Sequence, residues 1–569
     1  MQHLIKFRIP ALFCALSVLI CELISRPYVN MGVCDDWPYI LMAQHLATTG
    51  HILYNGWEAA MVGWQLYLAA AFIQLFGYSL TTARMSTLFV SMALAFVLQR
   101  CMVRAGISER NATLGTLAFA LSPLYLMLSV TFMSDIQGLF AIVICLYGCL
   151  RALQASTSRA TVAWLCFAVV TNAICGTSRQ IVWLGILVMV PSTLWLLRAQ
   201  RRVLLAGVAV TLAGALFILG CMHWFALQPF ILPEHLSVDT FPVALVLWQF
   251  VFFFLEFPLL LLPVAALFLP ELRKSSPRVL VVLLIGYVLV AVHPHHIQHV
   301  FLLEPTLGNW VNIYGTYNTV PLGLPPLFLG MAAQVLLTIA SFGGLLGLIA
   351  VVIRSRSTPS VAVTASPISW HQLGFLIAPL VIVYTLILIP RAATTGIYDR
   401  YMLGLLVVVL LCLVRFYQER VQARFPMASL LLVAIMAVYG VAATHNMFAL
   451  DRARVELATK LRSVGVPETS VDNGWEYNMG IELQHAGYIN DFRIVIPEHA
   501  YVPTPPPPAD HCPMYWYDRT PHVHPLYGVS FDPNKCYGPA PFAPVHYSRW
   551  LASGPGTLYV VRYTPPTKP

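Results

Sequence analysis

The sequence predicts an all-α polytopic membrane protein of about thirteen transmembrane helices, followed by a small extracytoplasmic α/β-like region. Three observations support this fold class. The chain of 569 residues is 58% hydrophobic and only 10% charged, whereas soluble domains carry about a quarter charged residues. Apolar segments long enough to cross a bilayer recur throughout residues 8–444. Clusters of basic residues separate them at alternate connections, which is typical of cytoplasmic loops.

The predicted spans are runs of about 20 mostly apolar residues, the length that crosses the hydrocarbon core of a bilayer. The first run follows Lys6 and Arg8 like the core of a signal peptide, but no small-residue cleavage site comes after it. We therefore interpret it as an uncleaved helix. The spans are 8–25, 82–103, 111–128, 133–152, 160–177, 180–198, 202–225, 246–269, 277–292, 326–353, 371–390, 400–417 and 425–444.

Segment 59–77 is nearly as apolar as the spans, and the charge pattern decides how it is interpreted. With a cytoplasmic N-terminus and 59–77 not crossing, every predicted cytoplasmic loop carries arginine or lysine, as the positive-inside rule requires. If 59–77 crossed, those clusters would all lie outside. We therefore predict a helix that lies in or dips into the outer leaflet, where Trp57, Trp64 and Tyr67 suit an interface.

This orientation divides the chain into a transmembrane domain, residues 1–444, and an extracytoplasmic C-terminal region, residues 445–569. The C-terminal region predicts strands at 492–496 (FRIVI) and 557–563 (TLYVVRY) and a polyproline linker at 503–508. Cys512 and Cys536 lie in polar sequence on the predicted oxidising side, so we predict a disulfide between them. The outer segments of the first domain are the first loop 26–81, with its interfacial helices, and the loops 226–245, 293–325 and 391–399.

Composition also limits the partners. The net charge of +9 does not indicate nucleic-acid binding, because the basic residues occur in short clusters between apolar segments. The chain has no GxGxxG motif, no Walker loop and no cytoplasmic insert large enough for a nucleotide-binding domain. A nucleotide sugar held by such a domain is therefore not an expected substrate.

Asp35 and Asp36 lie side by side directly after the first span. A carboxylate at a low-dielectric boundary loses hydration, so two adjacent ones are costly to keep there. One would suffice to cap the next helix, so we predict that they are catalytic, with Asp35 carrying the reaction and Asp36 supporting it. Asp135, at the outer mouth of the fourth span, is the third predicted catalytic acid; its alternative role is a helix N-cap.

Arginines at the outer ends of spans form the second group of candidates. The positive-inside rule disfavours Arg179, Arg391 and Arg400 at these positions, and an anionic ligand would account for them. Arginine forks suit phosphate oxygens in two-point contact. With Tyr401 they form the predicted phosphate-binding set. The alternative for Arg400 is a salt bridge to Asp399 or to another outer-face acid.

The loop 293–305 (HPHHIQHVFLLEP) is rich in imidazoles. It predicts a polar substrate wall, and a divalent metal site is the alternative, because imidazoles with a nearby carboxylate bind such ions. The spacing matches no fixed metal template, and no other cofactor is predicted. Glu256, in a span, is either a protonated structural group or part of a lipid-side pathway. The wall or metal candidates are Glu58, His293, His295, His296, His299 and Glu304.

Together these motifs resemble one family. The acidic pair, the stretch LFGYSLTTARMSTLFV, the aspartate before the fourth span, the TSRQ segment and the DRYML run are similar to motifs of the GT-C glycosyltransferases that use polyprenyl-phosphate sugars. That group contains the protein O-mannosyltransferases and the aminoarabinose transferase of lipid A (glycosyltransferase families 39 and 83). The resemblance covers about residues 1–420, and the predicted number of spans suits it.

The resemblance implies a sugar donor linked to undecaprenyl phosphate or a similar polyprenyl phosphate, used at the outer face of a bacterial inner membrane. It implies that Asp35 is the general base or orients the acceptor, that Asp135 is the second acid, and that Arg179 and Arg400 hold the donor phosphate. The chain departs from the family at Glu58-Ala59-Ala60, where an acidic residue is present but the basic residue that often follows it is absent.

The residues support the same chemistry without the resemblance. A carboxylate can take the proton of an attacking acceptor, and arginines or a metal can stabilise a leaving phosphate. The acceptor is a lipid, a glycan or a protein. Two other functions remain open: a transporter or flippase for a lipid-linked or anionic substrate, for which no internal repeat is visible, and an oligosaccharide ligase or polymerase.

Overall fold

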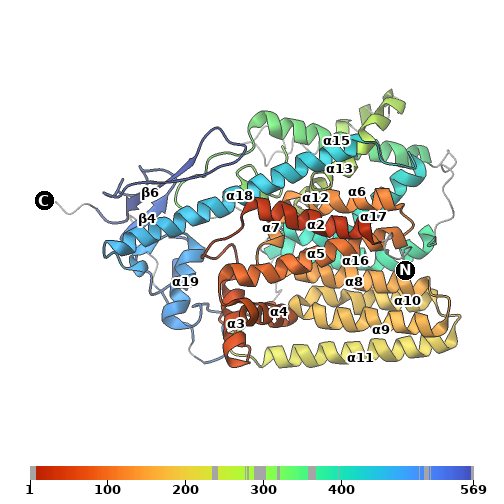
Figure 1. Cartoon of the computed structure of the whole chain (residues 1–569), viewed down its shortest axis with the longest axis horizontal. Coiled ribbons are helices and arrows are strands. Elements are labelled where there is room, and N and C mark those ends of the chain that lie inside the picture. The colour runs from red at the N-terminus through yellow and green to blue at the C-terminus, as the bar shows by residue number, and fades with distance from the viewer. Residues whose placement is uncertain are drawn as a thin grey trace.

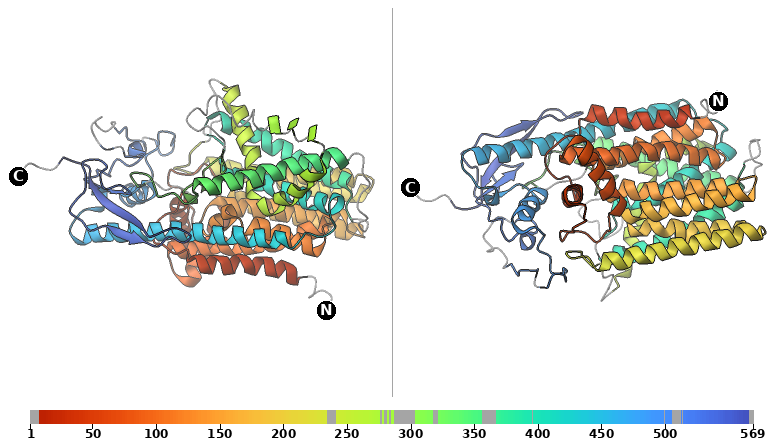
Figure 2. Two further views of the ribbon diagram at one scale, coloured as in Figure 1. Left: turned by 90° about the horizontal axis from the view of Figure 1, so that it is seen from above. Right: turned by 60° about the horizontal axis from the view of Figure 1, so that its bottom comes forward.

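Long helices pack side by side into a bundle, and a smaller region with a β-sheet lies at one end of it (Figure 1). This is the predicted fold class. The computed structural model describes residues 8–233, 241–275, 277–278, 281–282, 284–286, 303–316, 321–355, 367–394, 396–498, 500–504, 512 and 514–565. Figure 2 shows the sheet and the C-terminus at the same end of the bundle in two further views.

Within the described residues, nine helices are long and apolar enough to cross a membrane, and the bent pair α6–α7 would make a tenth. The predicted number of about thirteen is larger. Two of the predicted spans are apolar helical runs of 10–17 residues, α2 (Ile9–Ser25) and Gln180–Leu196, and the predicted span 277–292 lies largely outside the described residues. The nine include α5 (Leu80–Arg104), α8 (Ser134–Leu153), α9 (Ser158–Cys175), α11 (Arg201–Ala226), α12 (Val243–Leu260), α15 (Met331–Ser355), α16 (Trp370–Thr394), α17 (Leu403–Arg420) and α18 (Ala428–Ser463).

Two breaks in the helices have local causes. Between α6 (Glu109–Ala120) and α7 (Pro123–Ser129) the axis bends by 69°, because Pro123 cannot continue a helix but suits the first turn of a new one, which Ser122 caps. After α9 the chain passes through the short turns η1 (Gly176–Ser178), η2 (Gln180–Trp183) and η3 (Gly185–Met189) into α10 (Val190–Leu196). Arg179 is extended between the first two turns, which frees its side chain from a helix surface.

The predicted first outer loop holds α3 (Asp36–Thr49) and α4 (Gly63–Phe76), which pack on each other at the end of the bundle nearest the C-terminal region (Figure 1). The 14 residues of α4 span about 21 Å, shorter than the roughly 30 Å of a bilayer core. That length fits a helix that does not cross, and the sidedness of the chain stays a prediction.

The C-terminal region is built on α18, whose 36 residues continue without a break past the predicted domain boundary at 444. A four-stranded sheet of order β3-β4-β6-β5 packs against its far end, where Leu457 and Leu461 meet Val529 and Leu558. β3 and β4 are parallel, and the other pairs are antiparallel. The strands are β3 (Val471–Asp472), β4 (Tyr527–Ser530), β5 (Val545–Tyr547) and β6 (Gly556–Arg562); η7 (Glu468–Ser470), α19 (Trp475–Ala486) and η8 (Tyr517–Arg519) complete the region.

Of the two predicted strands, 557–563 is confirmed as β6, and 492–496 is wrong. Arg493 folds back on Asp491 through backbone and guanidinium hydrogen bonds of 2.8–2.9 Å, which makes a turn. Ile494 packs with Leu232 from the outer loop after α11 instead of facing a neighbouring strand. Of the predicted polyproline linker, residues 505–508 lie outside the described residues.

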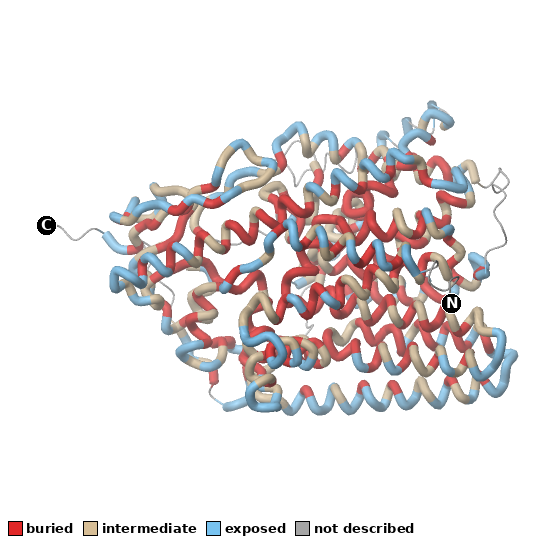
Figure 3. Tube along the Cα trace, in the orientation of Figure 1, coloured by how far each residue is buried: buried red, intermediate tan, exposed pale blue. Residues whose placement is uncertain are grey.

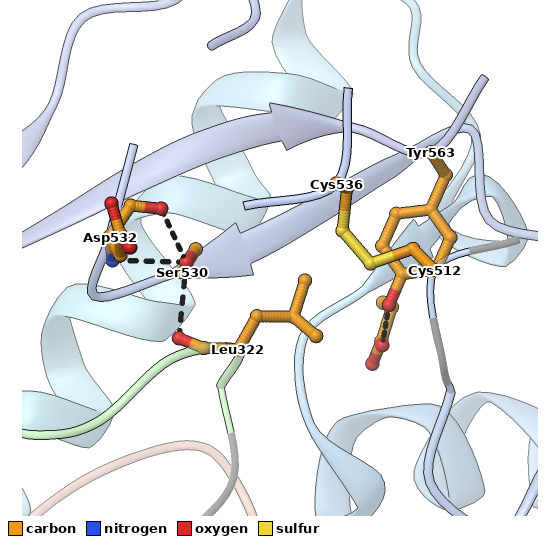
Figure 4. The surroundings of a disulfide bond; sticks show 7 residues. Leu322, Cys512, Ser530, Asp532, Cys536 and Tyr563 are labelled. Carbon is orange, nitrogen blue, oxygen red and sulfur yellow. Dashed lines mark hydrogen bonds between the residues drawn. A yellow bond between two sulfur atoms is a disulfide. The ribbon is translucent and has the colours of Figure 1, made fainter. Parts of the chain in front are cut away.

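The predicted disulfide between Cys512 and Cys536 is confirmed, with 5.3 Å between the two Cα atoms (Figure 4). It lies beside Tyr563, which follows β6. In the same view Leu322 of the outer segment 321–330 meets β4: Ser530 Oγ donates to the Leu322 carbonyl at 3.1 Å. The segment 321–330 and the C-terminal region are thus joined by a hydrogen bond.

Buried residues fill the middle of the bundle, and exposed residues lie along the helices at its edge (Figure 3). In the most apolar stretch of α11 only 22% of the residues are buried, against 78% for the helix of residues 399–420. α11 therefore shows a lipid-facing surface, while α17 is central. The remaining elements are α13 (Leu262–Ala265), η4 (Ala266–Lys274), η6 (Asp399–Met402) and the hairpin β1 (Val311–Asn312) and β2 (Gly315–Thr316).

Candidate active site

Four predicted site residues from distant parts of the chain meet at the outer-loop end of the bundle. Asp35 precedes α3, Asp135 lies in the first turn of α8, Arg179 lies between η1 and η2, and Arg400 lies in η6. Arg179 Nη1 donates to Asp135 Oδ1 at 2.5 Å. Arg400 lies between the two acids, with Nη2 at 3.5 Å from Asp35 Oδ2 and Nη1 at 3.8 Å from Asp135 Oδ2.

Tyr401 is surrounded by the three predicted phosphate-binding arginines. The guanidinium carbons of Arg179, Arg391 and Arg400 lie 4.9, 5.5 and 5.5 Å from the centre of its ring. Arg391 Nη2 also donates to the Tyr401 hydroxyl at 3.0 Å. Guanidinium groups gathered in this way can bind the oxygens of an anion in two-point contact.

A small, partly open pocket lies at this cluster. Asp135, Arg179 and Arg400 form its polar end. The rest of the wall is mostly apolar, and it includes Leu139, Ile142, Val182 and Leu403. Such a pocket suits a ligand with a charged group at one end and a hydrocarbon at the other.

Asp35 is the acid with partial access to solvent, its side chain being 19% exposed against 2% for Asp135. Trp57 Nε1 donates to Asp35 Oδ1 at 3.1 Å. Burial raises the pKa of Asp35 above its ordinary value, while Arg400 and the Trp57 hydrogen bond oppose that rise. A raised pKa makes a carboxylate a better proton acceptor near neutral pH.

Asp36 is in a different environment from its neighbour. Its side chain is fully buried and forms a two-point salt bridge with Arg84 of α5, at 2.7 and 3.1 Å. It also accepts the amide hydrogens of Val33 and Phe132, at 2.8 and 3.3 Å. These bonds occupy both oxygens, so Asp36 holds the loop that presents Asp35 and has no free oxygen for a substrate.

Arg84 was not among the predicted site residues, although it lies in the stretch LFGYSLTTARMSTLFV. The available signal was an arginine near the outer end of a predicted span, the same signal that identified Arg179. Arg84 is buried and also donates to the carbonyls of Val29 and Met31. It therefore fixes the backbone before Gly32, and its salt bridge to Asp36 holds the loop after Gly32.

Asp135 and Arg400 pair with each other across the site. Asp135 makes no side-chain cap on α8, because its carboxylate pairs with Arg179 and Arg400. The carboxylate of Asp399 accepts the amides of Trp310, Val311 and Arg400, each at 2.7 Å, and so anchors the outer segment 303–316. The Arg400 side chain pairs with Asp35 and Asp135, the other outer-face acids.

The wall or metal candidates are not brought together as one group. The four histidines lie outside the described residues. Glu58 is buried near Asp35, both its oxygens lack a hydrogen-bond partner among the described residues, and burial raises its pKa well above the ordinary value. In the described part of the chain no three His, Cys, Asp or Glu side chains form a metal-binding group. The metal alternative stays a prediction.

Glu304 lies beside Glu256, and burial raises the pKa of Glu304 well above its ordinary value. Glu256 Oε2 accepts the hydroxyl and the amide of Thr306 at 2.5 and 2.8 Å and the amide of Leu307 at 3.2 Å. Glu256 therefore has a structural contact, since it binds the outer segment 303–316 to α12. Neither glutamate lines the pocket at Arg400.

Comparison with solved structures finds matches among membrane enzymes. ArnT from Cupriavidus metallidurans bound to undecaprenyl phosphate is 13% identical, over 79% of this chain and 71% of that one, with a TM-score of 0.40. The archaeal oligosaccharyltransferase AglB from Archaeoglobus fulgidus, in complex with an inhibitory peptide and a dolichol-phosphate, is 14% identical over 90% and 64%, with a TM-score of 0.40. The S. cerevisiae protein O-mannosyltransferase Pmt1-Pmt2 complex bound to the sugar donor is 13% identical over 39% and 32%, with a TM-score of 0.30.

The chain is similar to these GT-C glycosyltransferases. No protein-family model and no curated protein matches it. Because identities of 13–14% and TM-scores of 0.30–0.40 carry no argument about chemistry, the function of this chain has to be argued from its own site.

Proposed function

We propose that the protein is a membrane glycosyltransferase that moves a sugar from a polyprenyl-phosphate-linked donor to an acceptor at the outer face of the membrane. The observation that carries this proposal is the group of three arginines around Tyr401. Two of them, Arg179 and Arg400, line a mostly apolar pocket, and Arg400 also lies beside Asp35. A phosphate, a hydrocarbon and a general base are needed together in this reaction and in few others.

The arginines support a phosphate ligand. Guanidinium groups bind phosphate oxygens in two-point contact, and Arg400 can turn from Asp35 and Asp135 toward a stronger anion, because both contacts, at 3.5 and 3.8 Å, are long. The apolar wall beside them suits the first isoprene units of a lipid tail. A nucleotide sugar would leave that wall without a partner.

Asp35 supports the transfer step. An acceptor hydroxyl or amine attacks the anomeric carbon on the face opposite the phosphate, and Asp35 takes its proton. The bond between the anomeric carbon and the phosphate oxygen breaks, its electron pair leaves with polyprenyl phosphate, and the arginines stabilise the negative charge that develops. The product has inverted configuration at the anomeric carbon.

The test uses the purified full chain in lipid nanodiscs with undecaprenyl phosphate carrying one radiolabelled sugar, and an extract of bacterial envelope lipids and glycans as acceptor. We expect label to move to the acceptor with release of undecaprenyl phosphate. Asp35→Asn should lower kcat by about 10²–10⁴-fold and keep donor binding, because a general base acts mainly in the transition state. Arg400→Ala should raise the donor KM more than Asp35→Asn does.

Three results would count against the proposal or one of its parts. If the Asp35→Asn protein is inserted in the membrane and transfers sugar at the parent rate, Asp35 is not the general base. Labelled donor that crosses the membrane of a sealed vesicle without losing its sugar would identify a flippase instead. Transfer of long glycans only, with single sugars unused, would favour the ligase or polymerase alternative.

A further inference from the structure

Four tryptophans from four separate segments pack together next to Asp35. Trp37 is in α3, Trp57 in the loop before α4, Trp475 at the start of α19, and Trp516 directly before η8. The Trp57 ring stacks on Trp475 with centroids 5.5 Å apart and lies 5.2 Å from Trp516 and 5.6 Å from Trp37. The cluster therefore joins the first outer loop to the C-terminal region.

Trp57 is the member of this cluster that reaches the candidate active site. Its indole N–H donates to Asp35 Oδ1, and Oδ2 of the same carboxylate faces Arg400. Together with the Cys34 thiol, which donates to Oδ2 at 3.7 Å, these contacts define the direction of the Asp35 carboxylate. A base held in this way by a third group is pre-organised for proton transfer.

The C-terminal partners of Trp57 are themselves fixed. Glu476, next to Trp475, accepts a hydrogen bond from Arg454 of α18 at 3.0 Å, and both side chains are fully buried. The Arg519 guanidinium carbon lies 3.8 Å from the centre of the Trp516 ring and 5.5 Å from that of Trp57. The disulfide at Cys512 holds the segment that leads to Trp516.

We propose that Trp57 is a positioning residue for the Asp35 carboxylate, and that the C-terminal region completes the catalytic centre by holding Trp57 in place. The inference rests on the proposed function, since it assigns a second part of the chain to the same site. The C-terminal region is then required for the chemical step, although the described contacts bring none of its side chains to Asp35 directly.

The charged and titratable groups around Asp35 set the expected pH behaviour. They are Arg400 from η6, Asp135 from α8, Tyr39 from α3, Glu58 from the loop before α4, and Cys34. Trp57→Phe keeps an aromatic ring but removes the N–H that stabilises the ionised form of Asp35. The acid limb of the kcat profile should then move upward by about one pH unit, and kcat on that limb should fall about tenfold, with the donor KM unchanged.

Trp37→Phe is the matched control. Its ring belongs to the same cluster, but its Nε1 has no hydrogen-bond partner among the described residues, so the pH midpoint should not move. Trp475→Ala and Trp516→Ala remove the support of Trp57 and should shift the midpoint in the same direction as Trp57→Phe. An unmoved midpoint in Trp57→Phe would overturn the positioning role, and an unmoved midpoint in both alanine variants would overturn the role of the C-terminal region.

A measurement without turnover separates this inference from the proposed function. Dicyclohexylcarbodiimide modifies protonated carboxyl groups, and mass mapping gives the pH at which Asp35 of the full chain is half modified. Trp57→Phe should raise that pH, and Trp37→Phe should leave it unchanged. If no sugar is transferred and the shift is still found, the proposed function fails while the Trp57–Asp35 coupling stands; an equal midpoint in parent and Trp57→Phe overturns the inference.

Discussion

Two adjacent aspartates differ in role because of the groups that each one contacts. Asp35 has an indole N–H, the weak donor thiol of Cys34 and a distant arginine as partners and is partly exposed. Asp36 has Arg84 and two backbone amides and is fully buried. The first arrangement leaves lone pairs for an acceptor proton, and the second uses them to hold the loop.

A prediction at this scale concerns Asp36→Asn, which removes the charge opposite the buried Arg84. Breaking a buried ion pair by removing one partner costs about 3–5 kcal/mol. We therefore expect less folded protein and a lower unfolding temperature, measured by size-exclusion chromatography of heated, detergent-solubilised samples.

Asp36→Asn combined with Arg84→Met should recover much of that loss, because no unpaired buried charge remains. Asp35→Asn is the comparison at the neighbouring position and should keep the parent unfolding temperature. If Asp36→Asn were as heat-stable as the parent, the salt bridge to Arg84 would not hold the loop.

At the scale of elements, α18 is the connection between the bundle and the C-terminal region. Its Arg454 is fully buried and pairs with Asp451 at 2.9 Å and with Glu476 of α19 at 3.0 Å. Two carboxylates thus share one guanidinium, and burial raises the pKa of Glu476 to about 7. This group attaches α19, and with it Trp475, to the part of α18 that extends beyond the bundle.

Arg454→Met should therefore loosen α19 from α18, because both acids lose their buried partner. We expect limited proteolysis to cut the segment around residue 487 faster than in the parent, with the helices of the bundle still intact. Lys460→Met is the control: Lys460 and Glu456 form an exposed pair on the same helix, worth about 0.3–0.5 kcal/mol. Equal cleavage of the two variants would contradict the role of Arg454.

At the scale of the whole molecule, the shared outer face of the site depends on the orientation of the chain. We predict that the N-terminus is cytoplasmic, that α4 does not cross, and that the C-terminal region is outside. A reporter active only outside the membrane should be active when fused after Gly77 or Val464 and inactive after Arg202. Activity after Arg202, or none after Gly77, would mean that α4 crosses and that the charge pattern was misinterpreted.

The sequence alone determined the features that depend on local composition. Apolar length predicted the positions of the spans, and polar context led to the Cys512–Cys536 pair. The predicted orientation also placed the candidate site residues in one group, because charges at the same ends of the helices must lie at the same face of the membrane. Asp35, Asp135, Arg179 and Arg400 were expected together for this reason, and they do lie together.

Only the tertiary structure decided which side chain each of these groups contacts. Arg84 is 48 residues from Asp36 in the sequence, and Trp475 belongs to a region that no motif connects with Trp57. The segment 492–496 has a strand-like composition, yet a turn at Asp491 and packing on the loop after α11 prevent strand pairing. Composition describes residues that are neighbours in the chain. A salt bridge, a stacked pair of rings or a pair of β-strands needs a partner whose position is set by the packing of the entire fold.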